Sequence, residues 1–285
     1  MRDQADQLRH LVRKTVDRSP ELYPGPPLVV ISGGARGVGA TTLAVGLTRE
    51  LARLGRQTVL VDANLTRPDV ANQMNLEAAG SLADVLSGSR SVSELLQPAG
   101  PAISVLPGRW LPETPPDLST EAIERFFAEL QLVRSQADVV VIDAGAGMSP
   151  WADRLWQSAQ LVLLTTTLDP TAVLESYATV KLSPTERISG KLRLVINRAK
   201  DQRAAERIGS RFAATCFRFL ETDIHQAGII GDTTINAPLF HQSLRLLAAD
   251  VVSSCLVAVD RVGRPFAPSA VAVDRTSTPL ANSTV

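Results

Sequence analysis

The chain has 285 residues, of which 45% are hydrophobic, and its 29 basic side chains balance its 29 acidic ones. This length fits one large α/β domain with terminal extensions, and the balanced charge lacks the basic excess that marks many nucleic-acid-binding proteins. Residues 1–20 are charged and have no signal-peptide core, and no apolar run reaches the roughly 20 residues that cross a bilayer. We therefore expect a cytoplasmic protein that binds no nucleic acid. Its two cysteines, Cys216 and Cys255, lack metal-like spacing and are predicted to be reduced.

The N-terminal segment differs in composition from the rest of the chain. Residues 3–16 have the periodicity of a short helix with a narrow apolar stripe. Residues 19–27 contain four prolines, which favour a stiff linker. The expected parts of the chain, in order, are a free helix over 1–18, the linker over 19–27, an α/β domain over 28–262 and a disordered tail over 263–285.

Strand-like and helix-like segments alternate through the predicted domain. Short apolar runs predict strands at 28–31, 57–61, 103–106, 139–142, 161–165, 192–196 and 224–230. Helical periodicity predicts helices at 41–54, 81–87, 92–96, 120–135, 171–182, 202–219 and 243–262. Since this alternation is typical of βαβ units, we expect a doubly wound, mostly parallel sheet with helices on both faces.

A glycine-rich loop, GGARGVGATT over residues 33–42, joins the first predicted strand to the first predicted helix. Such a loop directs backbone N–H groups and a helix N-terminus at one point, an arrangement that suits a phosphate. Gly37 and Gly39 would allow close approach of the backbone, and the Thr41 hydroxyl occupies the place of a Mg²⁺ ligand. An ordinary glycine-rich turn is the alternative interpretation of the loop alone.

The loop resembles the deviant Walker A motif of the MinD/ParA superfamily, K-G-G-x-G-K-[ST]-[ST], which aligns with residues 35–42. Ala35 replaces the signature lysine of that motif, Arg36 replaces the next glycine, and Ala40 replaces the lysine on the β- and γ-phosphates. The resemblance implies a P-loop NTPase fold of the MinD type, a homodimer, and ATP or ADP with Mg²⁺ as cofactor. The nucleotide-binding residues that it implies are Gly34, Ala35, Arg36, Gly37, Val38, Gly39, Ala40, Thr41, Thr42 and Asn197.

Two further segments follow predicted strands and resemble motifs of the same superfamily. Asp62-Ala63-Asn64 resembles the D-x-D motif, with Asn64 at the position of the second aspartate, near the attacking water. Asp143 begins a segment that resembles Walker B. The resemblance implies a catalytic role for Asp62 with a weakened one for Asn64, and a Mg²⁺ site made by Thr41, Asp62 and Asp143. Because alanine cannot neutralise phosphate charge, we expect ATP hydrolysis to be weak or lost, with Arg36 as a candidate replacement cation.

Within the superfamily, the sequence resembles the flagellar-number regulators FlhG and FleN. The N-terminal DQADQLR stretch resembles their D-Q-A-x-x-L-R element, and DAGAGMS over 143–149 resembles their Walker B segment. The resemblance implies a signal-recognition-particle-type partner GTPase, FlhF, together with flagellar basal-body components. The partner-binding residues that it implies are Asp3, Gln4, Ala5, Leu8 and Arg9.

Three functional interpretations remain open, namely an ATPase switch, a pseudo-ATPase adaptor for the GTPase, and a polar-localisation scaffold for pilus or secretion assembly. A competing resemblance, to polysaccharide-export tyrosine kinases, rests on residues 62–68 and 81–88. Kinase activity is disfavoured because the P-loop lysine is absent and the chain has only two tyrosines, neither in its C-terminal tail.

The helix at 243–262 is amphipathic but has few basic residues, so it is expected to pack on the sheet; the alternative is weak attachment to the inner face of the membrane.

Overall fold

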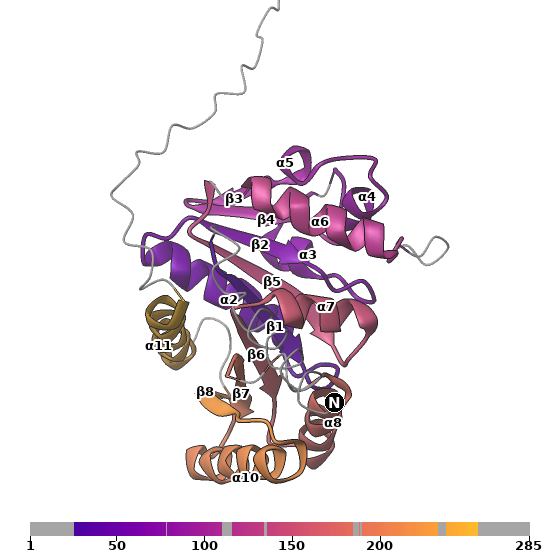
Figure 1. Ribbon diagram of the computed structural model, residues 1–285. Helices are drawn as coiled ribbons and strands as arrows, with labels where there is room; N and C mark the ends of the chain where they lie inside the picture. Colours follow the sequence, from indigo (N-terminus) through magenta and orange to yellow (C-terminus); the bar gives the residue numbers. More distant parts are fainter. Residues whose placement is uncertain are drawn as a thin grey trace, which may run out of the picture.

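The computed structural model describes residues 26–77, 79–109, 116–133, 136–184, 188, 190–232 and 238–255. The expected free helix over 1–18, most of the proline-rich linker and the expected tail over 263–285 lie outside these residues. The described part forms an eight-stranded sheet covered by helices on both faces (Figure 1), so the predicted fold class is confirmed.

The strands form one continuous sheet in the order β3-β4-β2-β5-β1-β6-β7-β8. All neighbouring strands are parallel except β3 and β4, which pair in antiparallel fashion at one edge. The central strands are fully buried apolar runs, as expected where helices cover both faces. The strand bounds are β1 Leu28–Gly33, β2 Thr58–Asp62, β3 Gln97–Gly100, β4 Ile103–Leu106, β5 Val139–Ala146, β6 Leu161–Thr166, β7 Leu192–Ala199 and β8 His225–Gly231.

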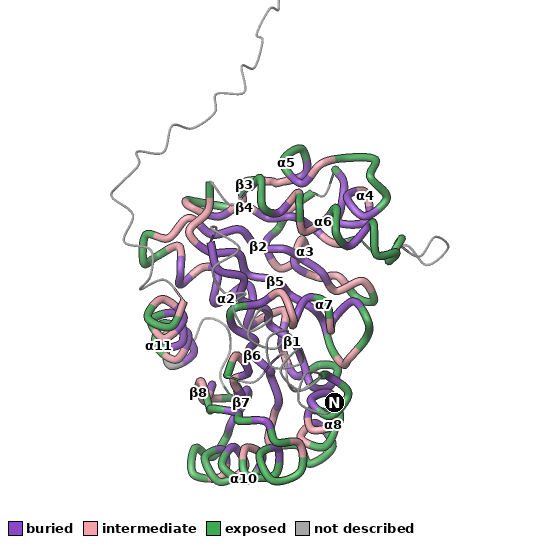
Figure 2. Tube along the Cα trace, viewed as in Figure 1, coloured by how far each residue is buried: buried purple, intermediate pink, exposed green. Residues whose placement is uncertain are grey.

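Two hydrophobic clusters fill the space between the sheet and its helices, and in Figure 2 the central strands are coloured as buried over most of their length. One cluster joins one sheet face to α2 (Ala40–Arg53), α3 (Val70–Met74) and α11 (Pro238–Cys255). The other joins the opposite face to the remaining helices. These are α4 Leu82–Leu86, α5 Val92–Leu95, α6 Thr120–Val133, α7 Pro150–Ser158, α8 Pro170–Leu182 and α10 Gln202–Leu220.

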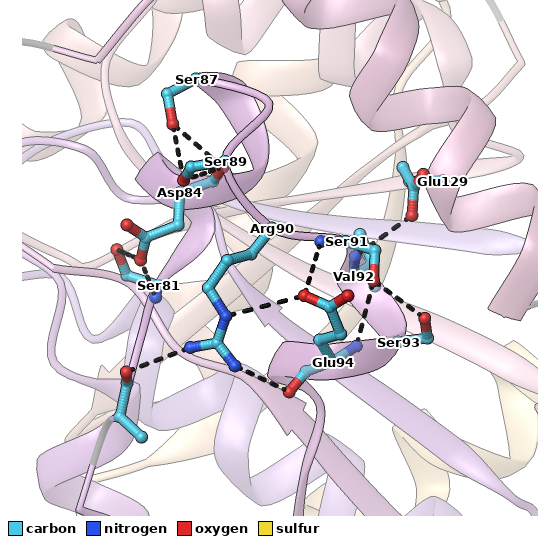
Figure 3. A network of polar contacts seen from close by, with 11 residues as sticks. Ser81, Asp84, Ser87, Ser89, Arg90, Ser91, Val92, Ser93, Glu94 and Glu129 are labelled. Atoms are coloured by element: carbon cyan, nitrogen blue, oxygen red, sulfur yellow. Dashed lines mark hydrogen bonds and ion pairs between the residues drawn. The ribbon is translucent and has the colours of Figure 1, made fainter.

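A polar network holds the two short helices α4 and α5 together (Figure 3). Arg90 lies at its centre and donates hydrogen bonds to the carbonyls of Ala79 and Glu94. Helix α6 binds the end of α4 and the start of α5, because Arg125 donates to the Leu86 carbonyl at 2.7 Å and Glu129 accepts from the Val92 N–H at 3.2 Å. These side chains form hydrogen bonds with backbone groups of α4, α5 and the residues next to them, so the polar residues of this region have a structural explanation.

Helix α11 packs against the sheet and α2. Its apolar residues Leu244, Leu247 and Val251 are buried, and Asp250 forms an ion pair with Arg193 of β7. Buried Glu50 of α2 faces His241 of α11, with 3.3 Å between the His241 Nδ1 and a Glu50 carboxylate oxygen. The apolar face of α11 is therefore occupied by the protein itself, as expected for a helix packed on the sheet.

The structure adds three elements that the sequence did not predict, α3, β3 and α7. It also moves the start of the last helix from residue 243 to Pro238 and extends β5 through Ala146. No helix in the described part of the chain is both long and apolar enough to span a membrane. Both cysteines are free thiols, with Cys216 buried and Cys255 partly exposed.

Candidate functional site

The glycine-rich loop lies between β1 and α2, where three parallel strands end together. It is held to both neighbouring strands: Gly34 N–H donates to the Thr165 carbonyl of β6, and Gly147 N–H, after β5, donates to the Gly33 carbonyl, each at 2.9 Å. Gly39 precedes α2 with φ of 92°, in the left-handed region that favours glycine. The loop is therefore a fixed turn that ends at the N-terminus of a 14-residue helix.

Helix α8 approaches the loop backbone closely at Gly34. A Cβ atom added at Gly34 would lie 1.9 Å from the Ser176 Oγ and 2.5 Å from the Ser176 Cα. The hydroxyl of Thr179 donates to the Gly34 carbonyl at 3.2 Å. Only glycine fits at this contact, so the packing of α8 and the position of the loop depend on each other.

The end of β7 contacts the loop from the other side. The Asn197 side-chain amide donates to the Val38 carbonyl at 2.8 Å, and the Arg198 guanidinium donates to the Gly37 carbonyl at 3.0 Å. A Cβ atom at Gly39 would lie 2.4 Å from the Asn197 Nδ2. The side-chain oxygen of Asn197 also accepts the Arg198 N–H. Asn197 thus lies against the loop, and its side-chain nitrogen and oxygen each already bond to the protein.

The positions of the missing lysines are buried or lie at the helix start. Ala35 is 8% exposed and packs in a small cluster with Val38 and Ala172 of α8. Ala40 is the first residue of α2 and is also 8% exposed. Arg36 is exposed, and its side chain forms no hydrogen bond or ion pair with the residues that the structure describes. The replacement charge that the sequence suggested at Arg36 is therefore not fixed in place by a protein contact.

Asp62 and Asp143 stand on neighbouring strands at paired positions in the parallel register of β2 and β5. Both are buried, with 1% and 0% exposure. Burial, and next the charge of Asp143, raise the pKa of Asp62 to about 7. Burial likewise raises the pKa of Asp143, while the nearby Thr41 side chain and the Gly145 N–H lower it. Two acids that resist ionisation together are a site where a cation would be stabilised.

The carboxylate of Asp143 is incompletely satisfied. One oxygen accepts the Gly145 N–H at 3.0 Å, while the buried Oδ2 has no hydrogen-bond partner. Within the described ranges, no group of three or more His, Cys, Asp or Glu side chains could hold a metal by itself. Mg²⁺ suits such a sparse set, since it prefers oxygen ligands and keeps waters or phosphates in most positions. The unpartnered oxygen and the Thr41 hydroxyl therefore fit Mg²⁺ beside a nucleotide.

Asn64 organises the loop that follows β2. Its side-chain oxygen accepts the N–H groups of Thr66 and Arg67, and its side-chain nitrogen donates to the Arg67 carbonyl at 2.9 Å. A carboxylate at this position could accept the same bonds but could not donate the last one. The asparagine therefore has a structural role that is separate from any effect on catalysis.

Two cavities flank the loop, with volumes of about 600 and 470 Å³. All predicted loop residues from Gly34 to Thr42 line one or both of them. The structure brings further residues to these cavities that the sequence did not predict, among them Arg67, Asp69, Ala146, Gly147, Thr167, Asp169, Thr171, Glu175 and Arg198. Most of these follow strand ends, which is the signal that could have identified them. The predicted partner-binding residues, Asp3 to Arg9, lie outside the described part.

The proteins to which the chain is similar in sequence include an antiactivator and a flagellum site-determining protein. The chain is 26% identical over 203 residues to the antiactivator FleN of Pseudomonas aeruginosa, a match that covers 71% of this chain and 72% of FleN. It is 25% identical over 156 residues to the flagellum site-determining protein YlxH of Helicobacter pylori, covering 54% of this chain and 53% of YlxH. The second match thus spans only about half of each protein. No protein-family model matches the chain.

The fold is shared with MinD. The structure of the septum site-determining protein MinD from Pyrococcus horikoshii, in complex with Mg-ADP, superposes with a TM-score of 0.61 at 17% identity, covering 79% of this chain and 96% of that one. This likeness concerns the arrangement of strands and helices around the loop. In sequence the chain is similar to FleN, YlxH and MinD, and it shares the fold of the MinD structures.

Proposed function

We propose that this protein is a nucleotide-binding regulator of flagellar placement or number that acts through dimerisation and a partner GTPase. The observation that carries the proposal is the similarity to FleN, an antiactivator, and to YlxH, a flagellum site-determining protein. The site geometry supports the nucleotide part, because a loop with helix α2 behind it faces a buried acid pair. The chain would therefore use the switch architecture of its relatives, with an altered loop.

The nucleotide would lie along the loop. Its phosphates would meet the backbone N–H groups of the loop between Gly34 and Thr42 and the positive end of the α2 dipole. Thr41, Asp143 and Asp62 would hold Mg²⁺ directly or through water. The ion would neutralise phosphate charge and bring the two buried carboxylates to their ionised forms.

Hydrolysis would be slow or absent in this protein. Phosphoryl transfer depends on cations that stabilise the developing charge, and Ala35 and Ala40 remove both lysines of the related motif. Asn64 cannot act as a carboxylate toward an attacking water. Binding without fast turnover favours an adaptor, whose two states would differ by the presence of nucleotide.

The first test is calorimetric titration of the full chain with ATP and with ADP in the presence of Mg²⁺, with the oligomeric state followed on a sizing column. Binding in the micromolar range with ATP-dependent dimerisation would support a nucleotide-responsive switch. The absence of binding at millimolar nucleotide would contradict the nucleotide part of the proposal and leave an adaptor that works without a ligand.

The partner part of the proposal rests on the N-terminal DQADQLR stretch. A chain lacking residues 1–18 should lose stimulation of a signal-recognition-particle-type GTPase while binding nucleotide as the full chain does. Stimulation that survives the deletion would favour the alternative, a polar scaffold for pilus or secretion assembly.

Membrane attachment through α11 would require this helix to leave the sheet, because its apolar face is buried. Sedimentation with anionic vesicles, with and without nucleotide, tests that possibility.

A further inference from the structure

The site has an acid pair and a phosphate-binding loop, but it lacks the lysines that would balance a nucleotide's charge. We infer that Arg198, at the end of β7, is the residue that contacts and neutralises the phosphates in their place, with Asn197 as its positioning residue. The inference rests on the proposed nucleotide-binding function and names the cation that would make it possible.

Arg198 is already located at the loop. Its guanidinium donates to the Gly37 carbonyl at 3.0 Å, and the residue lines both cavities beside the loop. The side chain is exposed and has no ion-pair partner among the residues that the structure describes, although Asp169 and Glu175 line the same larger cavity. Its positive charge is therefore available to an anionic ligand in either cavity.

The backbone of Arg198 is held in an unfavourable conformation. Its φ of 53° lies in the left-handed region, which costs about 1 kcal/mol or more for a residue with a side chain. The hydrogen bond from the Arg198 N–H to the Asn197 side-chain oxygen, 2.9 Å long, accompanies this conformation. A strained residue next to a binding loop indicates that its orientation matters, since strain of this kind concentrates at functional sites.

The contacts from β7 also orient the loop. Asn197 and Arg198 bond to the carbonyls of Val38 and Gly37, which fixes two successive C=O groups toward β7. A loop that binds an anion through backbone N–H groups needs its carbonyls directed elsewhere, because a carbonyl oxygen facing a phosphate would repel it. The Asn-Arg pair thus satisfies the loop carbonyls and places a guanidinium beside the same loop.

Arg36 and Arg67 are the competing cations at the cavities. Neither side chain is fixed by a hydrogen bond or an ion pair within the described ranges, so each would have to be ordered when the ligand binds. Ordering a long side chain on binding costs conformational entropy and lowers affinity. The Arg198 side chain loses less entropy on binding because its hydrogen bond to Gly37 already orders it in part. A guanidinium can also donate to two phosphate oxygens at once, which suits the phosphates of a nucleotide.

The test measures binding of ADP, ATP and adenosine to the full chain with Mg²⁺ by calorimetry. Arg198→Ala should weaken ADP and ATP binding about 10- to 100-fold, the range expected for a lost charged hydrogen bond, and leave any adenosine binding within about twofold. Arg198→Gln keeps a donor for the Gly37 carbonyl but removes the charge. A loss of ADP and ATP affinity similar to that of Arg198→Ala would therefore show that the charge matters, and not only the support of the loop. Arg203→Ala, an exposed arginine on α10, is the matched control and should bind as the wild type does.

The possible outcomes separate failure of the proposed role of Arg198 from failure of the proposed nucleotide binding. If the wild type binds ADP and Arg198→Ala binds it equally well, or if only Arg36→Ala shows the loss, Arg198 is not the phosphate-binding cation. If Arg198→Gln binds as the wild type does, the residue supports the loop alone and the inference is wrong. If the wild type binds no nucleotide at millimolar concentration, the proposed function fails first and the inference fails with it. Thermal unfolding of each variant without ligand confirms that the fold is kept.

Discussion

Asp62 and Asp143 face each other across paired positions of β2 and β5, both buried, and the pKa of each is raised by this burial. Residues at paired positions of neighbouring parallel strands lie side by side, so the pair is a direct consequence of the sheet order. Without a cation, the two carboxyl groups penalise each other's ionisation. The folded protein therefore carries a local instability at the point where Mg²⁺ would bind.

This arrangement predicts a pH-dependent stability of the ligand-free protein. The folded pKa of Asp62, about 7, lies above the ordinary value of 3.8 for an aspartate, so the folded state retains a proton that the unfolded state releases. Stability should fall as pH rises from about 4 to 7, by up to about 1.4 kcal/mol per pH unit from this group, and then level off. Asp62→Asn should remove this part of the decline, so its stability relative to wild type should rise between pH 5 and pH 8 in urea unfolding without Mg²⁺. An equal difference at both values would show that Asp62 ionises normally.

The contact between Gly34 and α8 predicts a large effect of one methyl group. Gly34→Ala would place a Cβ atom 1.9 Å from the Ser176 Oγ, so α8 or the loop must shift, at a cost of about 2 kcal/mol or more. Gly228→Ala is the matched control, because nothing lies within 4 Å of a Cβ there, and its stability should stay within about 0.5 kcal/mol of the wild type. Adding Ser176→Ala should rescue Gly34→Ala only in part, since the Ser176 Cα is also too close. Equal stability of the two glycine variants would contradict the packing.

The two cysteines should differ in reactivity. Burial raises the pKa of Cys216 to about 12 and that of Cys255 to about 11, so little thiolate is present in either at pH 8. Alkylation with iodoacetamide should be much slower in the folded than in the unfolded chain. Partly exposed Cys255 should be modified before Cys216, which faces the core from α10. Timed labelling followed by peptide mass spectrometry measures the order, and faster labelling of Cys216 would show that α10 packs by another face.

The sequence predicted the sheet well because its central strands are continuous apolar runs. It missed β3, since Gln97-Pro98-Ala99-Gly100 has no apolar pattern and forms a strand only through pairing with β4. It missed α7 because the helix begins with a proline directly after a glycine-rich segment, although Ser149 caps it through the Ala152 N–H. A local sequence pattern predicts elements that have their own apolar periodicity. It does not predict an element that forms only through its pairing with a neighbouring strand.

The candidate site was predictable to the same degree. The loop, Asp62 and Asp143 could be predicted because each directly follows an apolar run that predicts a strand. The contact of Arg198 with Gly37 joins residues 161 positions apart, and only the placement of β7 two strands from β1 brings them together. The burial of Ala35 against Ala172 is equally a product of α8 packing. The roles of the predicted site residues in binding stay predictions until nucleotide is measured.

Restoring a lysine at Ala40 should strengthen nucleotide binding. Ala40 is the first residue of α2 and lines the smaller cavity, so a lysine side chain there could extend beside the loop toward the phosphates. Ala40→Lys should raise the affinity for ADP with Mg²⁺ about tenfold, the gain expected from one charged hydrogen bond. The same change at Ala52, near the other end of α2, adds equal charge far from the loop and should leave binding unchanged.

The lysine also tests whether Arg198 fills the same role. If the guanidinium supplies the missing charge, Ala40→Lys should recover most of the ADP affinity that Arg198→Ala removes, because one cation would replace the other. The gain in affinity from Ala40→Lys should then be larger in the Arg198→Ala background than in the wild type, whereas independent effects would give the same gain in both backgrounds. Failure of Ala40→Lys to improve binding in either background would mean that the loop no longer directs this position at the phosphates, and that its alanine reflects a changed geometry rather than a lost charge.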